Sequence, residues 1–343
     1  MKIKFNSQLF KESIRNEEYT FDENIPIVFN ITNDLNFSKL KTKEEIDLAI
    51  KDYKLLCSSV ERFRQLIIYG VPSDVLARML ENLSNIEYLA ISNTELDFSE
   101  LGNMNLSELK RLHINSTVGE NSNELQEFVN ANRLENIQDV SFINASNLDK
   151  NRFFRDLPNP EKLQNVTISE PLPDPEIFSR FTEIQTLDIH NVKDANELSN
   201  FLRRIPLEKI RGFTITGCNM LDIEEDIFKR LESVVHLRFC ANDVTNYNKI
   251  FSGLPNPEKL ETVLVVGKEK SEELVKPDLL KRFENLNGLK LLEQHIDLDA
   301  LHEYLMQVKR LRSIELKNLN IQNLNFLEGI DYSIRVTISE ELV

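Results

Sequence analysis

The side chains of this chain that could do chemistry lie at alternating positions of short apolar segments. Three of the five histidines, His113, His190 and His236, each stand directly next to an apolar residue. Tyrosine, arginine, lysine and aspartate occupy the same kind of position elsewhere. The full set consists of Tyr69, Tyr88, Arg111, His113, Asp139, Asp188, His190, His236, Arg238 and Lys290. Side chains of these types could hold a metal ion, transfer protons or bind a protein partner.

A repeat of about 25 residues positions these side chains. Between Leu83 and Leu96, the residues Ile86, Leu89 and Ile91 follow the pattern L-x-x-L-x-L. Its first, fourth and sixth positions recur eleven times, at steps of 21 to 28 residues, and all thirty-three residues are apolar. The first positions are Phe63, Ile86, Leu109, Ile137, Leu163, Ile184, Ile210, Val234, Leu260, Leu286 and Leu311, and a last copy, Ile334–Ile338, closes the array. Such a period indicates a solenoid of short stacked strands.

The repeat also predicts which side chains are available for binding. Neighbouring residues of a strand point to opposite sides, so if positions four and six point into the core, positions three, five and seven form a second face. The polar set above occupies these positions, and it contains the residue types that are enriched in protein interfaces. Toward the C-terminal end this face turns apolar at Leu264, Val266 and Leu292. That run indicates either a partner site or a loop that covers it.

The spacing disfavours metal binding and catalysis. Parallel strands stand roughly 4.8 Å apart, so His190 and His236, two units apart, are about 10 Å from each other, and His113 is farther from both. His236 and Cys240 lie about 13 Å apart along one strand, too far for a nucleophile and its base. Phosphate-binding glycine loops, the G-x-S-x-G elbow and H-E-x-x-H are all missing from the sequence. We expect no enzyme, no cofactor and no metal site.

Composition narrows the class of partner. Lys and Arg number 41 against 56 Asp and Glu, a formal charge of −15. This field repels nucleic acid and anionic membranes and favours a basic protein partner. Three scattered cysteines predict free thiols in a reducing compartment, and the N-terminus has no apolar signal segment. We expect a cytoplasmic protein, with a nuclear location open, that is a monomer or a subunit of a hetero-complex.

Residues 1–60 do not fit the repeat, which fills residues 61–343. A strand is predicted at 25–31, with a proline near its start that an edge strand tolerates. A helix is predicted at 43–57, with Thr42 as its N-cap. This segment is placed to cap the open end of the solenoid. The alternative, an F-box-like docking segment, lacks the Leu-Pro opening and the tryptophan typical of that motif.

Helices are predicted between the strands. The clearest candidates are 123–130, 195–205, 222–231 and 298–308, and Asp174 followed by Pro175 starts another. The sequence Leu-Pro-Asn-Pro-Glu-Lys-Leu occurs at 157–163 and again 97 residues later at 254–260. It could be a recognition motif, but the prolines favour a structural role in ending a helix and returning the chain to the next strand. Its spacing of four units suggests duplication of unit pairs.

The repeated segments Ile86-Glu-Tyr-Leu-Ala-Ile and Leu311-Arg-Ser-Ile-Glu-Leu resemble the leucine-rich repeat family over residues 63–338. The unit length is similar to that of its ribonuclease-inhibitor-like and F-box-associated classes. The resemblance implies an α/β leucine-rich repeat solenoid, a right-handed curve with parallel strands on the concave side and helices on the convex side. The family places Asn or Cys at the ninth position, where only Cys218 and Asn242 conform, so we expect irregular turns.

The function expected from these observations is non-catalytic protein binding through the strands. Two alternatives stay open. One is a substrate receptor or adaptor of a ubiquitin-ligase complex that docks through residues 1–60. The other is an inhibitor or activator of a partner enzyme such as a GTPase or a nuclease.

Overall fold

The computed structural model describes residues 2–3, 27–31, 44, 47, 63–69, 86–92, 106–115, 134–146, 148–221, 223–243, 247–271, 276–294, 297–317, 324–331 and 333–339. Its contacts divide the chain into two units, Met1–Asn165 and Val166–Val343. The helix predicted at 123–130 lies outside the described residues. Of the helix predicted at 43–57, only Glu44 and Asp47 are described, and both are helical.

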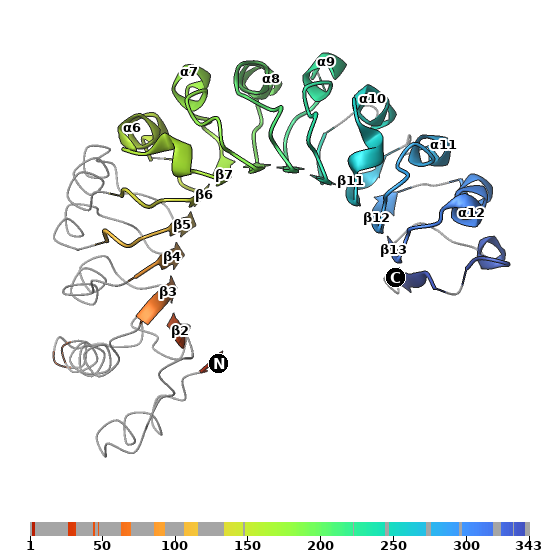
Figure 1. Cartoon of the computed structure of the whole chain (residues 1–343), viewed down its shortest axis with the longest axis horizontal. Coiled ribbons are helices and arrows are strands. Elements are labelled where there is room, and N and C mark those ends of the chain that lie inside the picture. The colour runs from red at the N-terminus through yellow and green to blue at the C-terminus, as the bar shows by residue number, and fades with distance from the viewer. Residues whose placement is uncertain are drawn as a thin grey trace. The chain divides into compact units, whose positions relative to one another are not determined.

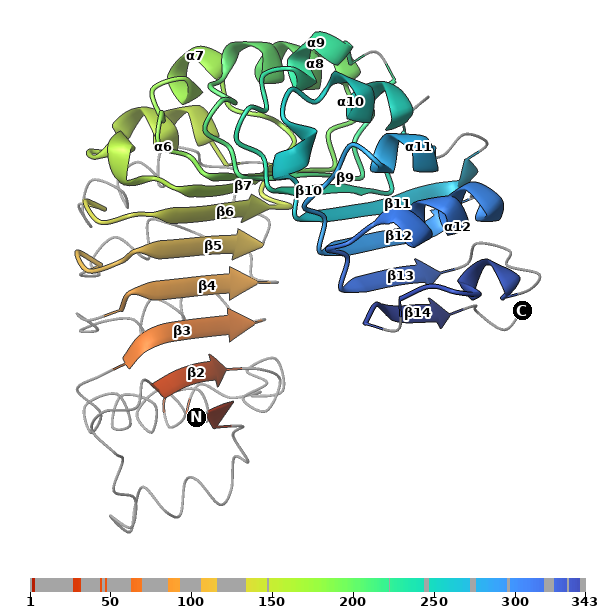
Figure 2. The same ribbon diagram turned by 45° about the vertical axis from the view of Figure 1, so that its right-hand side comes forward.

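The first unit stacks parallel strands in chain order. These are β1 (Lys2–Ile3), β2 (Ile27–Ile31), β3 (Phe63–Tyr69), β4 (Tyr88–Ser92), β5 (Arg111–Asn115) and β6 (Asp139–Ile143). In Figure 2, β3 to β6 lie side by side and point the same way. The strand predicted at 25–31 is β2, and it begins after Pro26. Strand β2 is not at the edge of the sheet, because Lys2 and Ile3 pair with Val28 and Phe29, and Pro26 lies outside the paired residues.

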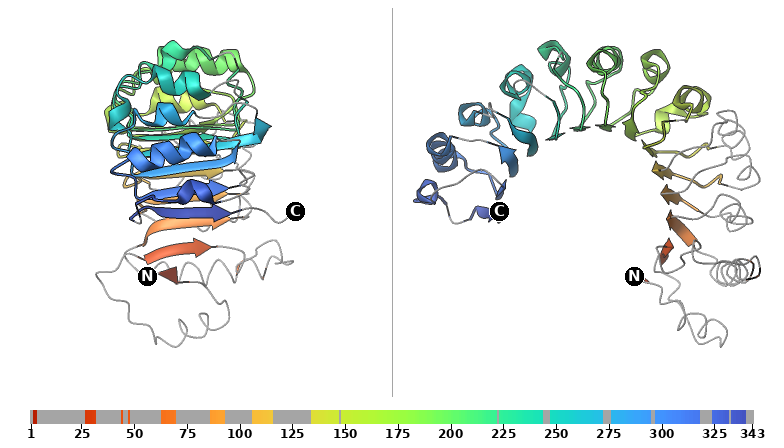
Figure 3. Two further views of the ribbon diagram at one scale, coloured as in Figure 1. Left: turned by 90° about the vertical axis from the view of Figure 1, so that its right-hand side faces the viewer. Right: turned by 180° about the vertical axis from the view of Figure 1, so that it is seen from behind.

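The second unit continues the same alternation of strand and helix. Its strands are β7 (Asn165–Ser169, whose first residue is counted in unit 1), β8 (Thr186–His190), β9 (Gly212–Thr216), β10 (His236–Cys240), β11 (Thr262–Ser271), β12 (Gly288–Gln294), β13 (Ser313–Lys317) and β14 (Arg335–Ser339). Its helices are α7 (Pro175–Phe178), α8 (Ala195–Arg204), α9 (Glu225–Phe228), α10 (Tyr247–Gly253), η4 (Pro257–Lys259), α11 (Pro277–Leu280), α12 (Leu298–Gln307) and η5 (Asn325–Leu327). Within this unit the strands line the inner side and the helices the outer side (Figures 1 and 3).

The core is built from the repeat positions that the sequence predicts. In the ten windows from Ile86 to Leu311, every residue at positions one, four and six is at most 3% exposed. Equal positions of neighbouring strands pair, as Leu89 does with Leu112 and Leu237 with Val263. Burial of one such side chain stabilises the fold by about 1.5–3 kcal/mol. The stacked rows therefore hold successive repeats together within each unit. The predicted leucine-rich repeat solenoid is confirmed.

The duplicated proline segment has a structural role. The first copy follows α6 (Lys150–Asp156) and forms η3 (Pro160–Lys162), and the second follows α10 and forms η4. In the first copy Asn159 Nδ2 and Lys162 Nζ donate to the carbonyl of Glu135, at 2.8 and 2.9 Å. In the second, Asn256 Nδ2 and Lys259 Nζ donate to the carbonyl of Glu232 at the same distances. In both copies, the Asn and Lys side chains therefore attach their repeat to the preceding repeat.

Four of the described turns after the strands share one backbone conformation. At position eight, Asn144, Asn191, Gly217 and Ala241 all adopt a left-handed backbone, with φ between 50° and 64°. The backbone N–H groups of Asn191 and Gly217 donate to the position-seven carbonyl of the next strand. Glu170, Gly267 and Glu293 also occupy position eight but lack this conformation, and the last two continue strands β11 and β12. Of the described turns, four are therefore regular and three are irregular as expected.

Where position nine does conform, its side chain joins successive turns. Asn242 is 3% exposed. Its Oδ1 accepts from the backbone N–H of Cys218 at 2.9 Å, and its Nδ2 donates to the carbonyl of Ile215 at 2.8 Å. In the same way Cys218 Sγ accepts from the backbone N–H of Val192 at 3.3 Å. In two other repeats the position is filled by a buried apolar side chain, Ala145 or Val192.

Helices of the second unit alternate in length. The predicted helices at 195–205 and 298–308 are confirmed as α8 and α12, and Asp174 caps α7 as expected. The helix predicted at 222–231 is wrong in extent, because α9 spans only Glu225–Phe228. Before it, Ile223 and Glu224 are not helical, and the N–H of Ile223 donates to the carbonyl of Met220. Longer helices at α8, α10 and α12 thus alternate with four-residue helices at α7, α9 and α11, in agreement with repetition by unit pairs.

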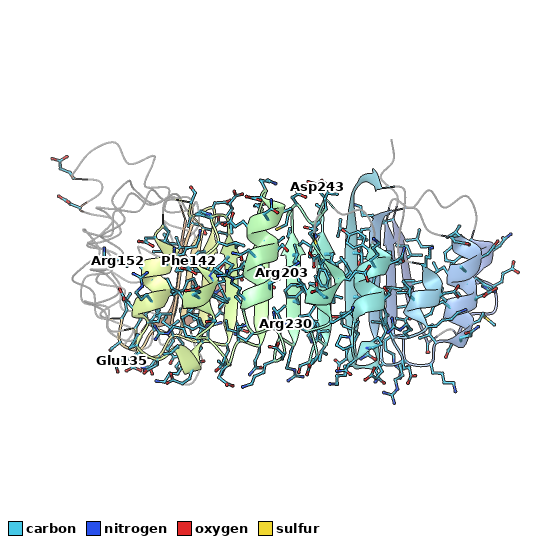
Figure 4. The ribbon with its side chains drawn as sticks, turned by 90° about the horizontal axis from the view of Figure 1, so that it is seen from above. Glu135, Phe142, Arg152, Arg203, Arg230 and Asp243 are labelled. Carbon is cyan, nitrogen blue, oxygen red and sulfur yellow. The ribbon has the colours of Figure 1, made fainter. Side chains whose placement is uncertain are left out.

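An arginine after α9 closes the end of α8. The Arg230 guanidinium donates to the carbonyls of Leu202, Arg203 and Ile205 and pairs with the Glu208 carboxylate at 3.0 Å. Figure 4 shows Arg230 and Arg203 on the helical side of this unit. Arg282 makes the corresponding bonds to the carbonyls at the end of α10. These carbonyls have no partner within their own helix, so the arginines supply the missing donors.

Candidate protein-binding face

The candidate site is the side of the sheet that faces away from the core. We name it the strand face and define it as the side chains at positions three, five and seven of β4–β6 in the first unit and of β8–β14 in the second. Most of these side chains are half-buried or exposed, in contrast to the rows between them. The prediction that alternate residues of each strand divide between core and surface is confirmed for these strands.

In the first unit, four of the predicted residues converge into one cluster. His113 on β5 lies between Tyr88 on β4 and Asp139 on β6. Its Nδ1 is 3.2 Å from Tyr88 Oη, and its Nε2 is 3.0 Å from Asp139 Oδ1. The Arg111 guanidinium carbon lies 4.5 Å from the centroid of the Tyr88 ring. The rings of Tyr88 and His113 meet edge to face, with centroids 5.0 Å apart. We call these four residues the Tyr88 cluster.

The electrostatics of the Tyr88 cluster suit recognition better than catalysis. Burial raises the pKa of the Tyr88 hydroxyl; Arg111 lowers it and Asp139 raises it. The hydroxyl therefore stays protonated and can donate to His113 Nδ1, while Nε2–H donates to Asp139. A nucleophilic tyrosine would need a lowered pKa, which is the opposite of what this environment produces. The arrangement instead holds two rings and one guanidinium in place at a half-exposed surface.

In the second unit the predicted residues do not converge. Lys290 pairs with Glu315 of the next strand at 2.6 Å, and His236 Nδ1 lies 2.8 Å from Thr262 Oγ1. Arg238 is exposed and makes no hydrogen bond or ion pair within the described part of the chain. Sequence reasoning missed the partner Thr262, although both residues occupy position three of neighbouring strands and so stand directly opposite each other.

His190 and its neighbour Asp188 share β8. Burial lowers the pKa of the His190 imidazole, and the carboxylate of Asp188 opposes that shift without reversing it. Tyr69 belongs to β3, but its side chain lies outside the described residues. The apolar residues of the face, Leu264, Val266 and Leu292, are half-buried on β11 and β12.

Among the described residues, no group of three or more His, Cys, Asp or Glu side chains is placed to hold a metal ion. The same part of the chain contains no helix with the length and apolar character needed to cross a membrane.

Comparisons with known proteins give distant matches among solved structures. No protein-family model matches, and no curated protein sequence matches. Among solved structures, an internalin (inlF) from Listeria monocytogenes is 15% identical, with a TM-score of 0.43 over 88% of this chain and 94% of its own. An internalin C2 from the same organism is 16% identical, with a TM-score of 0.31 over 78% and 84%. A TLR13 complex with single-stranded RNA is 13% identical, with a TM-score of 0.46 over 85% of this chain and 53%, about half, of the TLR13 chain. The fold assignment rests on the chain's own strands, core rows and turns, which are those of a leucine-rich repeat solenoid.

Proposed function

We propose that this protein is a non-catalytic scaffold that binds a protein partner through its strand face. The observation that carries the proposal is the Tyr88 cluster. Tyrosine and arginine are the residue types that dominate binding energy in interfaces, and the cluster presents both on adjacent strands. Hydrogen bonds and ring contacts already hold these side chains in one arrangement, so binding costs little additional side-chain entropy.

The strands explain why such a face can be specific. Each side chain of the face projects from a strand whose alternate residues are locked in the core, so its position is defined by the core rows. A solenoid of this kind therefore presents a pattern of side chains at regular spacing. We also propose that residues 1–60 cap the open end of the array, which the pairing of β2 with β3 supports, and that the protein acts in the cytoplasm.

Affinity capture with the full chain tests the proposal. The wild-type protein and variants are immobilised at equal density, exposed to a native lysate, and the retained proteins are quantified by mass spectrometry. The informative variants are Tyr88→Ala combined with Arg111→Glu in the first unit, and Arg238→Glu in the second. The matched control is Lys249→Glu, an exposed lysine on α10, which gives the same change of charge as Arg238→Glu on the helical side.

The proposal predicts that one or more proteins retained by the wild type are lost with a strand-face variant and kept by Lys249→Glu. Circular dichroism and urea unfolding check that each variant is folded. Equal retention by all variants, or no retention above the bare matrix, would refute binding through this face.

A further inference from the structure

An apolar patch interrupts the polar strand face of the second unit. It consists of Cys240 on β10, Leu264 and Val266 on β11, and Leu292 on β12, all half-buried. Cys240, Val266 and Leu292 stand side by side at position seven of three neighbouring strands. Leu264 stands at position five beside Val266. We call these four residues the apolar patch.

The sheet is extended at this place. Strands β8, β9 and β10 end at position seven, whereas β11 continues to Ser271 and β12 to Gln294. Backbone pairing between the two longer strands reaches Ser271 and Gln294, and β11 extends past the ends of its neighbours in Figure 2. Leu264, Val266 and Leu292 therefore lie within a longer run of sheet, and Cys240 is the last residue of the shorter strand beside them.

Cations flank the patch. Along position five, Leu264 stands directly between Arg238 on one side and Lys290 on the other. Arg238 is exposed and unpaired within the described residues, whereas Lys290 pairs with Glu315 at 2.6 Å. Neighbouring strands are roughly 4.8 Å apart. If a side chain of a partner segment lies above Leu264, the residues next to it in that segment can therefore reach Arg238 and Lys290.

The charge of this face is opposite to that of the whole chain. On the strand face of β8–β14, four side chains are basic and two are acidic: Arg238, Lys290, Lys317 and Arg335 against Asp188 and Glu315. The chain as a whole carries a formal charge of −15. At physiological ionic strength a charge acts over about 8 Å, so the local excess decides what docks here. The basic partner expected from the net charge suits other surfaces of the chain, and this face suits an acidic one.

We propose that the apolar patch and its two cations bind a segment of a partner protein in which an apolar side chain lies next to carboxylates. The apolar side chain covers Leu264, Val266 and Leu292. One carboxylate pairs with Arg238, and a second reaches Lys290, where it competes with Glu315. Arginine can bind a carboxylate through two parallel hydrogen bonds, which gives the contact direction as well as strength. This inference rests on the proposed function and names the chemistry of the partner at one part of the same face.

Single-stranded RNA fits the site less well than a peptide. Its phosphates would pair with the cations, but sequence-tolerant binding of single strands depends on aromatic side chains that stack on the bases. The apolar patch has aliphatic and thiol groups at these positions and no aromatic ring. An aliphatic surface gains from contact with an apolar side chain of a peptide.

A displayed library of random linear peptides is the test. The full chain is the bait, enriched peptides are sequenced, and the affinities of two synthetic peptides are measured by fluorescence anisotropy. Matched baits carry Arg238→Glu, Leu264→Asp, or the control Lys249→Glu. A uridine-rich single-stranded RNA of 20 nucleotides is titrated in parallel. Far-UV circular dichroism confirms that each bait is folded.

The proposal predicts enriched peptides with Asp or Glu adjacent to Leu, Ile or Phe. Arg238→Glu should weaken their binding about tenfold, or about 1.4 kcal/mol, and Lys249→Glu should leave it unchanged. Leu264→Asp should weaken it as well, while raised salt should weaken the wild type and leave Arg238→Glu nearly unaffected.

Three results would overturn the proposal, and they separate it from the proposed function. If basic peptides are enriched and their binding is lost with Arg238→Glu or Leu264→Asp, the partner is not acidic, but protein binding through this face is still supported. Tighter binding of the RNA, also lost with Arg238→Glu, would assign the site to nucleic acid. Enrichment that no strand-face variant changes, or no enrichment at all, would show that the apolar patch binds no linear segment. The lysate capture with Tyr88→Ala and Arg111→Glu would still test the proposed function at its other cluster.

Discussion

Replacing Asn242 by alanine tests the view that the position-nine side chain holds consecutive turns together. The wild-type side chain is 3% exposed and makes two hydrogen bonds with backbone groups of the preceding repeat. Alanine removes both bonds and leaves the N–H of Cys218 and one lone pair of the Ile215 carbonyl without these partners. The substitution keeps β10 and the left-handed residue Ala241 before it.

The size of the effect follows from the two backbone groups. A buried donor or acceptor that loses its partner costs about 1–3 kcal/mol. The Cys218 N–H bears the larger share, because a carbonyl has a second lone pair for other donors. We therefore expect Asn242→Ala to lower the free energy of unfolding by about 3 kcal/mol. Asn242→Asp keeps the acceptor for Cys218 but places a carboxylate against the Ile215 carbonyl, so it should not rescue stability.

Two measurements detect the loss of stability. Urea unfolding followed by circular dichroism gives the global change, and hydrogen exchange by mass spectrometry of peptides covering 215–243 gives the local one. A local loss of about 3 kcal/mol speeds amide exchange about a hundredfold. The control is Asn287→Ala, an exposed asparagine before β12, which should change stability by less than about 0.5 kcal/mol. If Asn242→Ala unfolds and exchanges like Asn287→Ala, the side chain does not join the turns.

Three further substitutions probe other buried or linking groups. The Tyr304 hydroxyl is buried and has no hydrogen-bond partner in the described structure. Tyr304→Phe should therefore raise the free energy of unfolding, measured with urea, by about 1 kcal/mol. A lower free energy of unfolding would mean that the hydroxyl has a partner. Arg230→Ala should cost about 2 kcal/mol in urea unfolding, because it removes donors from the carbonyls at the end of α8, whereas Lys229→Ala beside it should cost little. Burial lowers the pKa of His190, so the unfolded chain binds its proton more readily and stability falls as pH drops through about 6.5; His190→Gln should reduce the difference in midpoint between pH 7 and pH 5, and an unchanged difference would contradict this assignment.

The core rows could be read from the sequence because they depend only on periodicity. Once the neighbouring residues at position four or six are buried, the strand register directs the side chain at that position into the core as well. All such residues from Leu89 to Leu316 are buried. Four turns share a left-handed residue at position eight, which the residue at position nine does not predict. Residues that tolerate a left-handed backbone occupy position eight at Asn144, Asn191 and Gly217, whereas Gly267 at the same position continues strand β11, so the residue type alone does not decide the turn.

Side-chain contacts across the strand face fall into two kinds with different predictability. Lys290 with Glu315 and His236 with Thr262 are directly opposite residues, so register alone places them together.

The Tyr88 cluster is diagonal: His113 at position five reaches Tyr88 and Asp139 at position three of the strands on either side. The residues directly opposite His113 are Ala90 and Ser141, both small and buried, so neither fills the space beside the imidazole nor offers it a large partner. The ring is then free to turn toward the diagonal phenol and carboxylate, which are about 7–8 Å away between Cα atoms and within reach of long side chains. Register gives the neighbours of a residue, but the size of the opposite side chains decides whether its polar contacts run across the strands or along the diagonal. That choice depends on rotamers and packing together, so the sequence predicts the four residues of the Tyr88 cluster but not the contacts between them.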